Sequence, residues 1–152
     1  MADVPAIHAL IAKAAKTSPV LPRSQAALYE TLRDFFVSEN AEGTVVGCCA
    51  LHISWTDLAE IKSLSVDESA RHRGLGKTLV QTCLDEALDL KIRRVFCLTA
   101  AIEFFAKLGF REVDKHELPH KIWGDCINCP KFPDCDELAM VHDLTWPEAP
   151  AK

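Results

Sequence analysis

The stretch SLSVDESARHRGLGKTLV, from Ser63 to Val80, has the residue types and the spacing of an anion-binding turn. It follows an apolar run and places Gly74 and Gly76 directly before a helical pattern. Glycines leave room beside the free N–H groups at the start of a helix, where phosphate groups bind readily. Four further side chains supply positive charge or a titratable ring at the same turn: Arg71, His72, Arg73 and Lys77.

A plainer interpretation of this turn stays open. A lone GxG is more often an ordinary strand-to-helix turn with solvated arginines. The GxxxxGK[ST] spacing of a P-loop is absent, and no third glycine follows Gly76 as the dinucleotide-binding GxGxxG pattern requires. The surrounding sequence must therefore decide between a solvated turn and a phosphate site.

A carboxylate and an amine lie on the strand that precedes the turn. Glu60 and Lys62 are two residues apart, so both point to one face of the strand predicted over residues 58–66. A strand glutamate of this kind is more often solvated on the outer face. Burial beside apolar neighbours would instead raise the pKa of Glu60 towards neutrality, which suits a general base.

The seven cysteines fall into two groups. Cys126, Cys129 and Cys135 form a C-x2-C-x5-C pattern, for which the favoured interpretation is a proline-pinned loop with packed thiols. A structural zinc site with a fourth ligand (His116, His120 or Asp136) and a redox pair are the alternatives. We expect no metal to be required for chemistry. The other four lie in apolar runs and are expected in the core: Cys48, Cys49, Cys83 and Cys97.

The composition is that of an ordinary globular chain, with 152 residues of which 49% are hydrophobic and 26% charged. We expect one domain over residues 1–145 and a flexible tail over residues 146–152. No apolar run reaches ~18 residues, so no membrane span is predicted. The absence of an export signal favours a cytoplasmic location. A net charge of −5 argues against nucleic acid as a partner.

Hydrophobic periodicity predicts an α+β, or mixed α/β, domain with a central sheet. Ser24 is expected to cap a second helix whose apolar face runs from Ala27 to Phe35 or Phe36. Gly109 is expected to end a short helix in the left-handed conformation. The other expected helices cover residues 6–16, 75–88 and 101–108, and the expected strands cover residues 34–39, 44–53, 58–66, 93–99, 110–113 and 137–144. Short polar turns between the early strands predict antiparallel hairpins.

These features together resemble the GNAT family of N-acetyltransferases. The turn has the form R-x-x-G-x-G directly after AEIKSLSV, which is similar to the family's acyl-CoA pyrophosphate loop, and LTAAIEFFAKLGF is similar to a second family motif. The resemblance implies the GNAT fold, with a mostly antiparallel sheet, and acetyl-CoA as the donor. It implies pantetheine paired with a strand edge where the sheet splays open. The acetyl-CoA site so implied comprises Leu64, Ser65, Val66, Arg71, His72, Arg73, Gly74, Leu75, Gly76, Lys77, Phe104 and Phe105.

A closer similarity is to the stand-alone N-acetylglutamate synthases of arginine biosynthesis. It rests on LPRSQAALYE, GCCALHI, AEIKSLSV, EFFAKLGF and LPHKIWGDCINCPKFPDCDE, which span most of the chain. The resemblance implies acetyl transfer to the α-amine of L-glutamate, with Glu60 as the base that deprotonates the ammonium. Arginine suits a substrate carboxylate, and the family places Arg23 there. Lys62 and Lys121 are the further cations expected to bind substrate.

Several points stay open at the level of sequence. Many relatives carry a tyrosine in the short helix to protonate the leaving thiolate, whereas this chain has Phe104 and Phe105 there, so the general acid is unassigned. The acceptor is alternatively another amino acid, a polyamine or a protein amine. A non-catalytic acyl-CoA-binding regulatory module is a third reading of the same features. A homodimer is compatible with the family, and packing or surface roles are expected for His8, His52 and His142.

Overall fold

The computed structural model describes residues 1–18, 20–119 and 137–146. Its elements, in chain order, are α1 (Val4–Thr17), α2 (Gln25–Glu30), β1 (Phe35–Glu39), β2 (Val45–Trp55), β3 (Leu58–Val66), α3 (Leu75–Asp89), β4 (Arg94–Thr99), α4 (Ile102–Ala106), β5 (Arg111–Val113) and β6 (Leu138–Asp143). Short 3-10 turns lie at η1 (Leu32–Asp34), η2 (Glu68–Ala70) and η3 (Lys115–Glu117). The order of helices and strands confirms the mixed α/β class predicted from the sequence.

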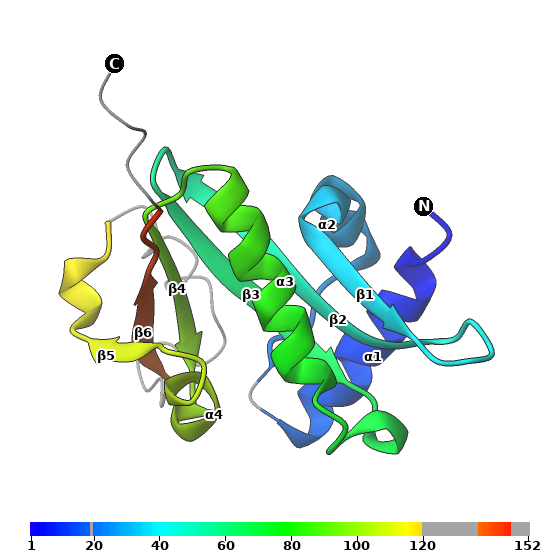
Figure 1. The fold of residues 1–152 in the computed structure, drawn as a ribbon. Coiled ribbons are helices and arrows are strands. Elements are labelled where there is room, and N and C mark those ends of the chain that lie inside the picture. The colour runs from blue at the N-terminus through cyan, green and yellow to red at the C-terminus, as the bar shows by residue number, and fades with distance from the viewer. Residues whose placement is uncertain (19, 120–136, 147–152) are drawn as a thin grey trace.

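The strands form one six-stranded sheet in the order β1-β2-β3-β4-β6-β5. β3 and β4 pair in parallel, and the other four pairs are antiparallel. Figure 1 shows α3 across the front of the sheet and α1 behind it. Among the described residues, every helix is too short or too polar to cross a membrane.

Adjacent residues of β2 point into two different hydrophobic cores, one on each face of the sheet. Cys49 packs with α3, where Val80 and Cys83 are buried, whereas Cys48 packs with Ile7 and other residues of α1. The predicted burial of the four core cysteines is confirmed, and all four are free thiols. Burial raises the pKa of Cys48 to about 12, so this thiol stays protonated near neutral pH.

β3 contains a bulge at Ser63. Cys48 of β2 pairs with Ser65 of β3. Ala50, two residues on, pairs with Lys62, which is three residues before Ser65. Ser63 takes up the extra residue with a φ of 56°, and its carbonyl accepts a hydrogen bond from the Cys48 thiol at 3.4 Å. Such a bulge bends a strand and increases its twist.

β3 and β4 pair over only three residues and then part. Residues 58–60 pair with residues 94–96, after which β3 runs on to Val66 while β4 stays paired with β6. Figure 1 shows the two strands diverging towards the end of the sheet where α3 begins. The edge of β3 beyond Glu60 therefore presents backbone groups that β4 does not bond.

The second helix is shorter than predicted. α2 ends at Glu30, and Phe35 and Phe36 lie in β1, so the prediction that they extend the apolar helix face was wrong, whereas the strand predicted over residues 34–39 is confirmed. The Thr31 hydroxyl donates to the carbonyl of Ala27 at the end of the helix. Pairing of β1 with β2 outweighs the helical spacing of these aromatic residues, because tertiary context overrides local propensity.

The ends of the later elements agree with the sequence. Gly109 follows α4 with a φ of 90°, as predicted for a left-handed helix terminator. A β-carbon at this position would lie 2.9 Å from the His142 ring. That ring packs against Phe110, with centroids 5.3 Å apart, which agrees with the packing role expected for His142.

Candidate active site

The glycine turn joins the free edge of β3 to α3. Gly74 is the N-cap residue of α3 and has a φ of 77°, which glycine adopts without strain. A β-carbon on Gly74 would meet nothing within 4 Å, whereas one on Gly76 would lie 3.4 Å from the ring of Phe104. The first N–H groups of α3 have no carbonyl partner within the helix. The turn thus presents hydrogen-bond donors with little side-chain cover.

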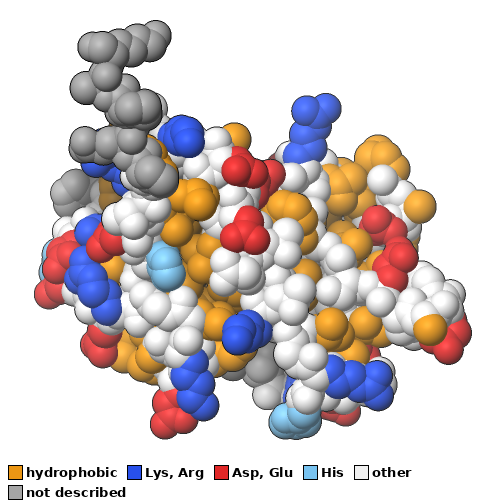
Figure 2. Space-filling view, viewed as in Figure 1, with side chains coloured by type: hydrophobic (Ala, Val, Ile, Leu, Met, Phe, Trp, Pro, Cys, Tyr) orange, Lys and Arg blue, Asp and Glu red, His pale blue; other side chains and the backbone are white. Residues whose placement is uncertain are grey.

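Positive charge surrounds this turn at the surface. The side chains of Arg71, His72, Arg73 and Lys77 are exposed. In Figure 2, Lys or Arg side chains and a histidine lie along the lower edge of the molecule, where Figure 1 shows the turn into α3. Arg71 also folds back so that its Nε donates to the carbonyl of Val66 at 3.3 Å. The sequence prediction of a cationic turn at a helix start is confirmed.

Asp67 fixes the start of the turn and ties it to α1. One carboxylate oxygen accepts hydrogen bonds from the N–H and the hydroxyl of Ser69, and the other accepts one from Lys13 Nζ at 3.1 Å. The bonds from Ser69, together with the bond and charge of Lys13, lower the pKa of Asp67 to about 2. The turn is therefore held by contacts that need an ionised Asp67.

Glu60 and Lys62 form an ion pair on the other face of the sheet. Glu60 is only 8% exposed, and Lys62 Nζ lies 3.3 Å from its Oε2. Ala59 and Ile61 pack with α3, so Glu60 and Lys62 point away from α3, as their spacing predicted. Glu60 is thus buried and paired, and it is not the solvated strand residue of the plainer interpretation. Burial disfavours its charge, whereas the ammonium of Lys62 favours it.

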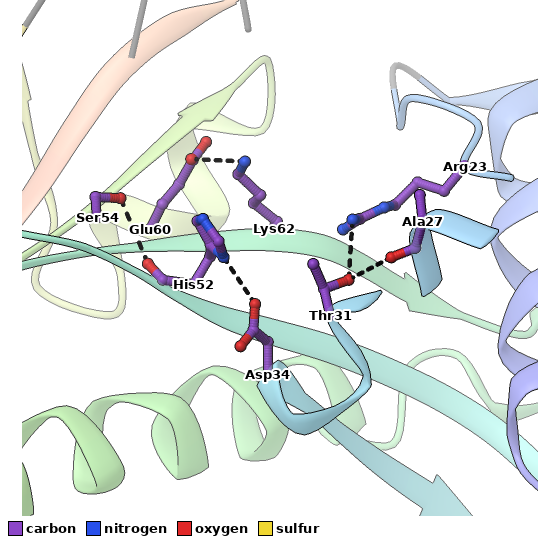
Figure 3. Close-up of polar contacts among 8 residues, drawn as sticks. All are labelled: Arg23, Ala27, Thr31, Asp34, His52, Ser54, Glu60 and Lys62. Carbon is purple, nitrogen blue, oxygen red and sulfur yellow. Dashed lines mark hydrogen bonds and ion pairs between the residues drawn. The ribbon is translucent and has the colours of Figure 1, made fainter. Parts of the chain in front are cut away.

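Arg23 approaches the same face from the loop before α2 (Figure 3). Its Nη2 donates to Thr31 Oγ1 at 3.0 Å, and its Cζ lies 5.8 Å from the centre of the Phe35 ring. The neighbouring Ser24 caps α2 as predicted, accepting the N–H of Ala27 at 3.1 Å. A guanidinium carries five N–H groups, so the bond to Thr31 still permits bidentate pairing with a carboxylate.

His52 is a residue of this face that the sequence analysis assigned only to packing or the surface. It pairs with Glu60 across the β2–β3 ladder, so the two side chains are neighbours on one face. Its Nδ1 lies 2.7 Å from Asp34 Oδ2 of η1. Figure 3 shows His52 with Asp34, Glu60, Lys62 and Arg23 in one polar group. The signal that could have found His52 is the hairpin register, which sequence spacing alone does not fix.

The remaining predicted acetyl-CoA residues divide between surface and core. Ser65 is buried, and Leu64 and Val66 are partly buried against the core beneath α3. Leu75 is half-buried in the first turn of α3. Phe105 is buried between the rings of Phe104 and Phe110, with centroids 5.0 and 5.2 Å away. The ring of Phe104 and the side chain of Val66 lie beside Gly76, where the turn meets the end of β3.

Four predicted site residues, Lys121, Cys126, Cys129 and Cys135, lie outside the described residues. Within the part of the chain that the structure describes, no three His, Cys, Asp or Glu side chains are grouped to hold a metal ion. The zinc alternative for the cysteine segment therefore remains a sequence-based prediction.

Residues 7–110 match the acetyltransferase (GNAT) family, which is well over half of the chain. The chain belongs to the GNAT family. An uncharacterized N-acetyltransferase of Chlorobaculum tepidum is 41% identical over 144 residues, covering 95% of this chain and 92% of the relative. The amino-acid acetyltransferase of Mycobacterium tuberculosis is 42% identical over 144 residues, covering 93% of this chain and 75% of that protein.

Solved GNAT structures share the same fold. Rv2747 from Mycobacterium tuberculosis, in complex with CoA, has a TM-score of 0.80 at 33% identity, and 95% of each chain is covered. The N-acetylglutamate synthase from Neisseria gonorrhoeae, complexed with coenzyme A and N-acetyl-glutamate, has a TM-score of 0.85 at 29% identity. The match covers 96% of this chain but only 34% of that synthase.

This GNAT chain is an acetyl-CoA-dependent N-acetyltransferase, similar to amino-acid acetyltransferases. The geometry fits an acyl-CoA substrate in two respects. The turn from Arg71 to Lys77 offers uncovered N–H groups and cations for a diphosphate. The edge of β3 after Glu60 offers backbone groups for an extended amide chain.

Replacing Asp67 with alanine tests whether its ionised carboxylate holds the turn. At pH 7 we expect Asp67→Ala to lower the free energy of unfolding by about 1 kcal/mol, because a capping carboxylate and a surface ion pair are lost. The folded-state pKa is depressed, so this stabilisation is full above about pH 4 and is lost as the pH falls towards 2. Urea unfolding of both proteins at several pH values measures it. A difference that persists unchanged at pH 2 would contradict this account.

Proposed function

We propose that this enzyme transfers the acetyl group of acetyl-CoA to the α-amine of L-glutamate, giving N-acetyl-L-glutamate for arginine biosynthesis. The observation that carries the proposal is a buried carboxylate, Glu60, paired with a cation on the face beside the opening of the sheet. Lys62 contacts it directly, and Arg23 approaches from the loop before α2. The names of the mycobacterial acetyltransferase and the neisserial synthase support an amino-acid acceptor.

Glu60 is the proposed general base. An α-ammonium has no lone pair, so a proton must leave the nitrogen before it attacks the thioester carbonyl. Glu60 lies at the last residue where β3 pairs with β4, and the reactive thioester is proposed to lie where the strands part. The carboxylate accepts the proton from the ammonium, directly or through water. The neutral amine then forms the new C–N bond while the C–S bond of the thioester breaks, and the nitrogen gives its second proton to water as the thiolate leaves.

The cations are proposed to recognise the two carboxylates of glutamate. Arg23 supplies a planar fork that suits one carboxylate. Lys62 holds Glu60 and adds positive charge beside the same space. Lys121, which lies outside the described residues, is the candidate for the second carboxylate. A polyamine would meet repulsion from these cations, so an acidic acceptor fits the charge pattern better.

The donor is proposed to lie along β3 and the glycine turn. Backbone groups of residues 64–66 pair with the pantetheine chain, and the turn from Arg71 to Lys77 binds the diphosphate. Phe104 lies beside Gly76 and Phe105 packs against Phe110, and neither side chain has an acidic proton to donate. The leaving thiolate therefore takes its proton from water. A single catalytic domain over residues 1–145, a cytoplasmic location and a homodimer belong to the same proposal.

Replacing Glu60 tests the base. We expect Glu60→Gln to lower kcat by about 100-fold or more, because the isosteric amide cannot accept the proton. Calorimetric titration with acetyl-CoA should give an unchanged dissociation constant. Glu112→Gln, at an exposed residue of β5, is the matched control and should keep full turnover. Turnover of Glu60→Gln near the wild-type rate would remove Glu60 from the mechanism.

Kinetics with different acceptors test both the choice of glutamate as substrate and the role of Arg23 in binding it. In a thiol-release assay across amino acids and diamines, we expect glutamate to give the highest kcat/KM. Arg23→Ala should raise the KM for glutamate by about tenfold or more, since a charge-assisted bidentate contact is lost, and leave the KM for acetyl-CoA nearly unchanged.

Thr31→Val is the control for this substitution, because it removes the bond to Arg23 but keeps the guanidinium. It should change the KM for glutamate far less than Arg23→Ala does. Equal effects of the two substitutions would mean that Arg23 only supports α2. A preference for a diamine would contradict the proposed acceptor.

A further inference from the structure

Each turnover must remove one proton from a buried site. An ammonium and a thioester give an amide, a thiol and one proton, so the base must lose that proton before the next cycle. The proposed base, Glu60, is only 8% exposed and lies on an interior strand of the sheet. Its neighbour Lys62 is a cation and has no lone pair with which to accept a proton. The proton leaving Glu60 therefore needs another acceptor.

His52 has the position and the exposure that such an acceptor requires. It lies directly across from Glu60 in the antiparallel β2–β3 register, where paired β-carbons are about 5 Å apart. Its side chain is 42% exposed, so the imidazole spans from the buried carboxylate towards solvent. Figure 3 shows the ring between the side chains of Glu60 and Asp34.

Asp34 sets the form and orientation of this imidazole. A carboxylate only accepts hydrogen bonds, so the 2.7 Å contact between Asp34 Oδ2 and His52 Nδ1 places a hydrogen on Nδ1. In the neutral ring the lone pair then belongs to Nε2.

We propose that His52 carries the proton from Glu60 to solvent and that Asp34 is its positioning residue. The inference rests on the proposed role of Glu60 as base. The O–H bond of the protonated Glu60 breaks and an N–H bond forms at His52 Nε2, directly or through one water. Nε2 then gives the proton to water or buffer, which restores the neutral imidazole and the Glu60 carboxylate.

The charges around His52 come from three elements. Asp34 approaches from η1, and Glu60 and Lys62 approach from β3. Behind Asp34, Glu86 of α3 is close enough that burial and the charge of Asp34 raise the pKa of Glu86. A proton on His52 thus has carboxylates on two sides and one cation beside it.

Buffer-dependent kinetics of His52→Gln distinguish a relay from a purely structural residue. In dilute buffer we expect kcat to fall about tenfold or more, with the KM values of both substrates within about twofold of wild type. Raising the concentration of imidazole buffer should restore kcat, because a small base replaces the missing proton acceptor. His8→Gln, a histidine of α1 outside this site, should behave like wild type at every buffer concentration.

Asp34→Asn gives a second test that keeps the imidazole. It should lower kcat less than His52→Gln does, and imidazole should again restore the rate. Thermal unfolding checks that each variant is folded. If His52→Gln does not fold, Asp34→Asn alone tests the inference. A folded variant that keeps the wild-type kcat in dilute buffer, or one whose loss of kcat imidazole does not relieve, would overturn the inference. If Glu60→Gln also keeps its activity, the proposed base has failed as well; if Glu60→Gln is inactive, only the relay has failed.

Discussion

At Ser63 the backbone of β3 enters the left-handed region, and the ladder with β2 takes up one extra residue there. The strand bends at this bulge, just after its last residue paired with β4. A buried strand edge with unbonded N–H and C=O groups is costly unless a partner satisfies them. Hydrogen bonds to an extended amide chain would satisfy the backbone groups of β3 that β4 does not bond in this opening. The protonated thiol of Cys48 holds the bulge by donating to the Ser63 carbonyl.

The two faces of β3 carry different side chains and are proposed to serve different parts of the reaction. Towards α3 the strand contributes apolar side chains, so the donor is proposed to meet backbone and the bare turn at Gly74. Towards α1 and α2 the strand contributes Glu60 and Lys62, and β2 adds His52. The acceptor and its proton are thus proposed to be handled on one face, and the diphosphate is proposed to bind at the end of the other. The ion pair of Lys13 with Asp67 links α1 to the turn.

Local patterns predicted most of the fold because they depend on neighbours in sequence. The two glycines of the turn, the Ser24 cap and the two-residue spacing of Glu60 and Lys62 each require a particular backbone geometry, and the structure has each of them. The apolar spacing that extended α2 to Phe35 failed because pairing with β2 competes with helix formation. His52 could not be assigned from sequence, because its neighbours Glu60 and Asp34 meet it only through strand register and a 3-10 turn. The bulge does leave a trace in the sequence, since the residues of β3 that face α3 change from Ala59 and Ile61 to Leu64 and Val66, a one-residue shift in the alternation.

Amide hydrogen exchange with and without coenzyme A tests most directly whether the opened edge of β3 and the glycine turn bind the donor. Binding should slow exchange over residues 61–66 and 72–77, where backbone N–H groups gain partners, and leave residues 35–39 of the outer strand β1 unchanged. Protection confined to other segments, or no change at all with coenzyme A in excess, would contradict the account.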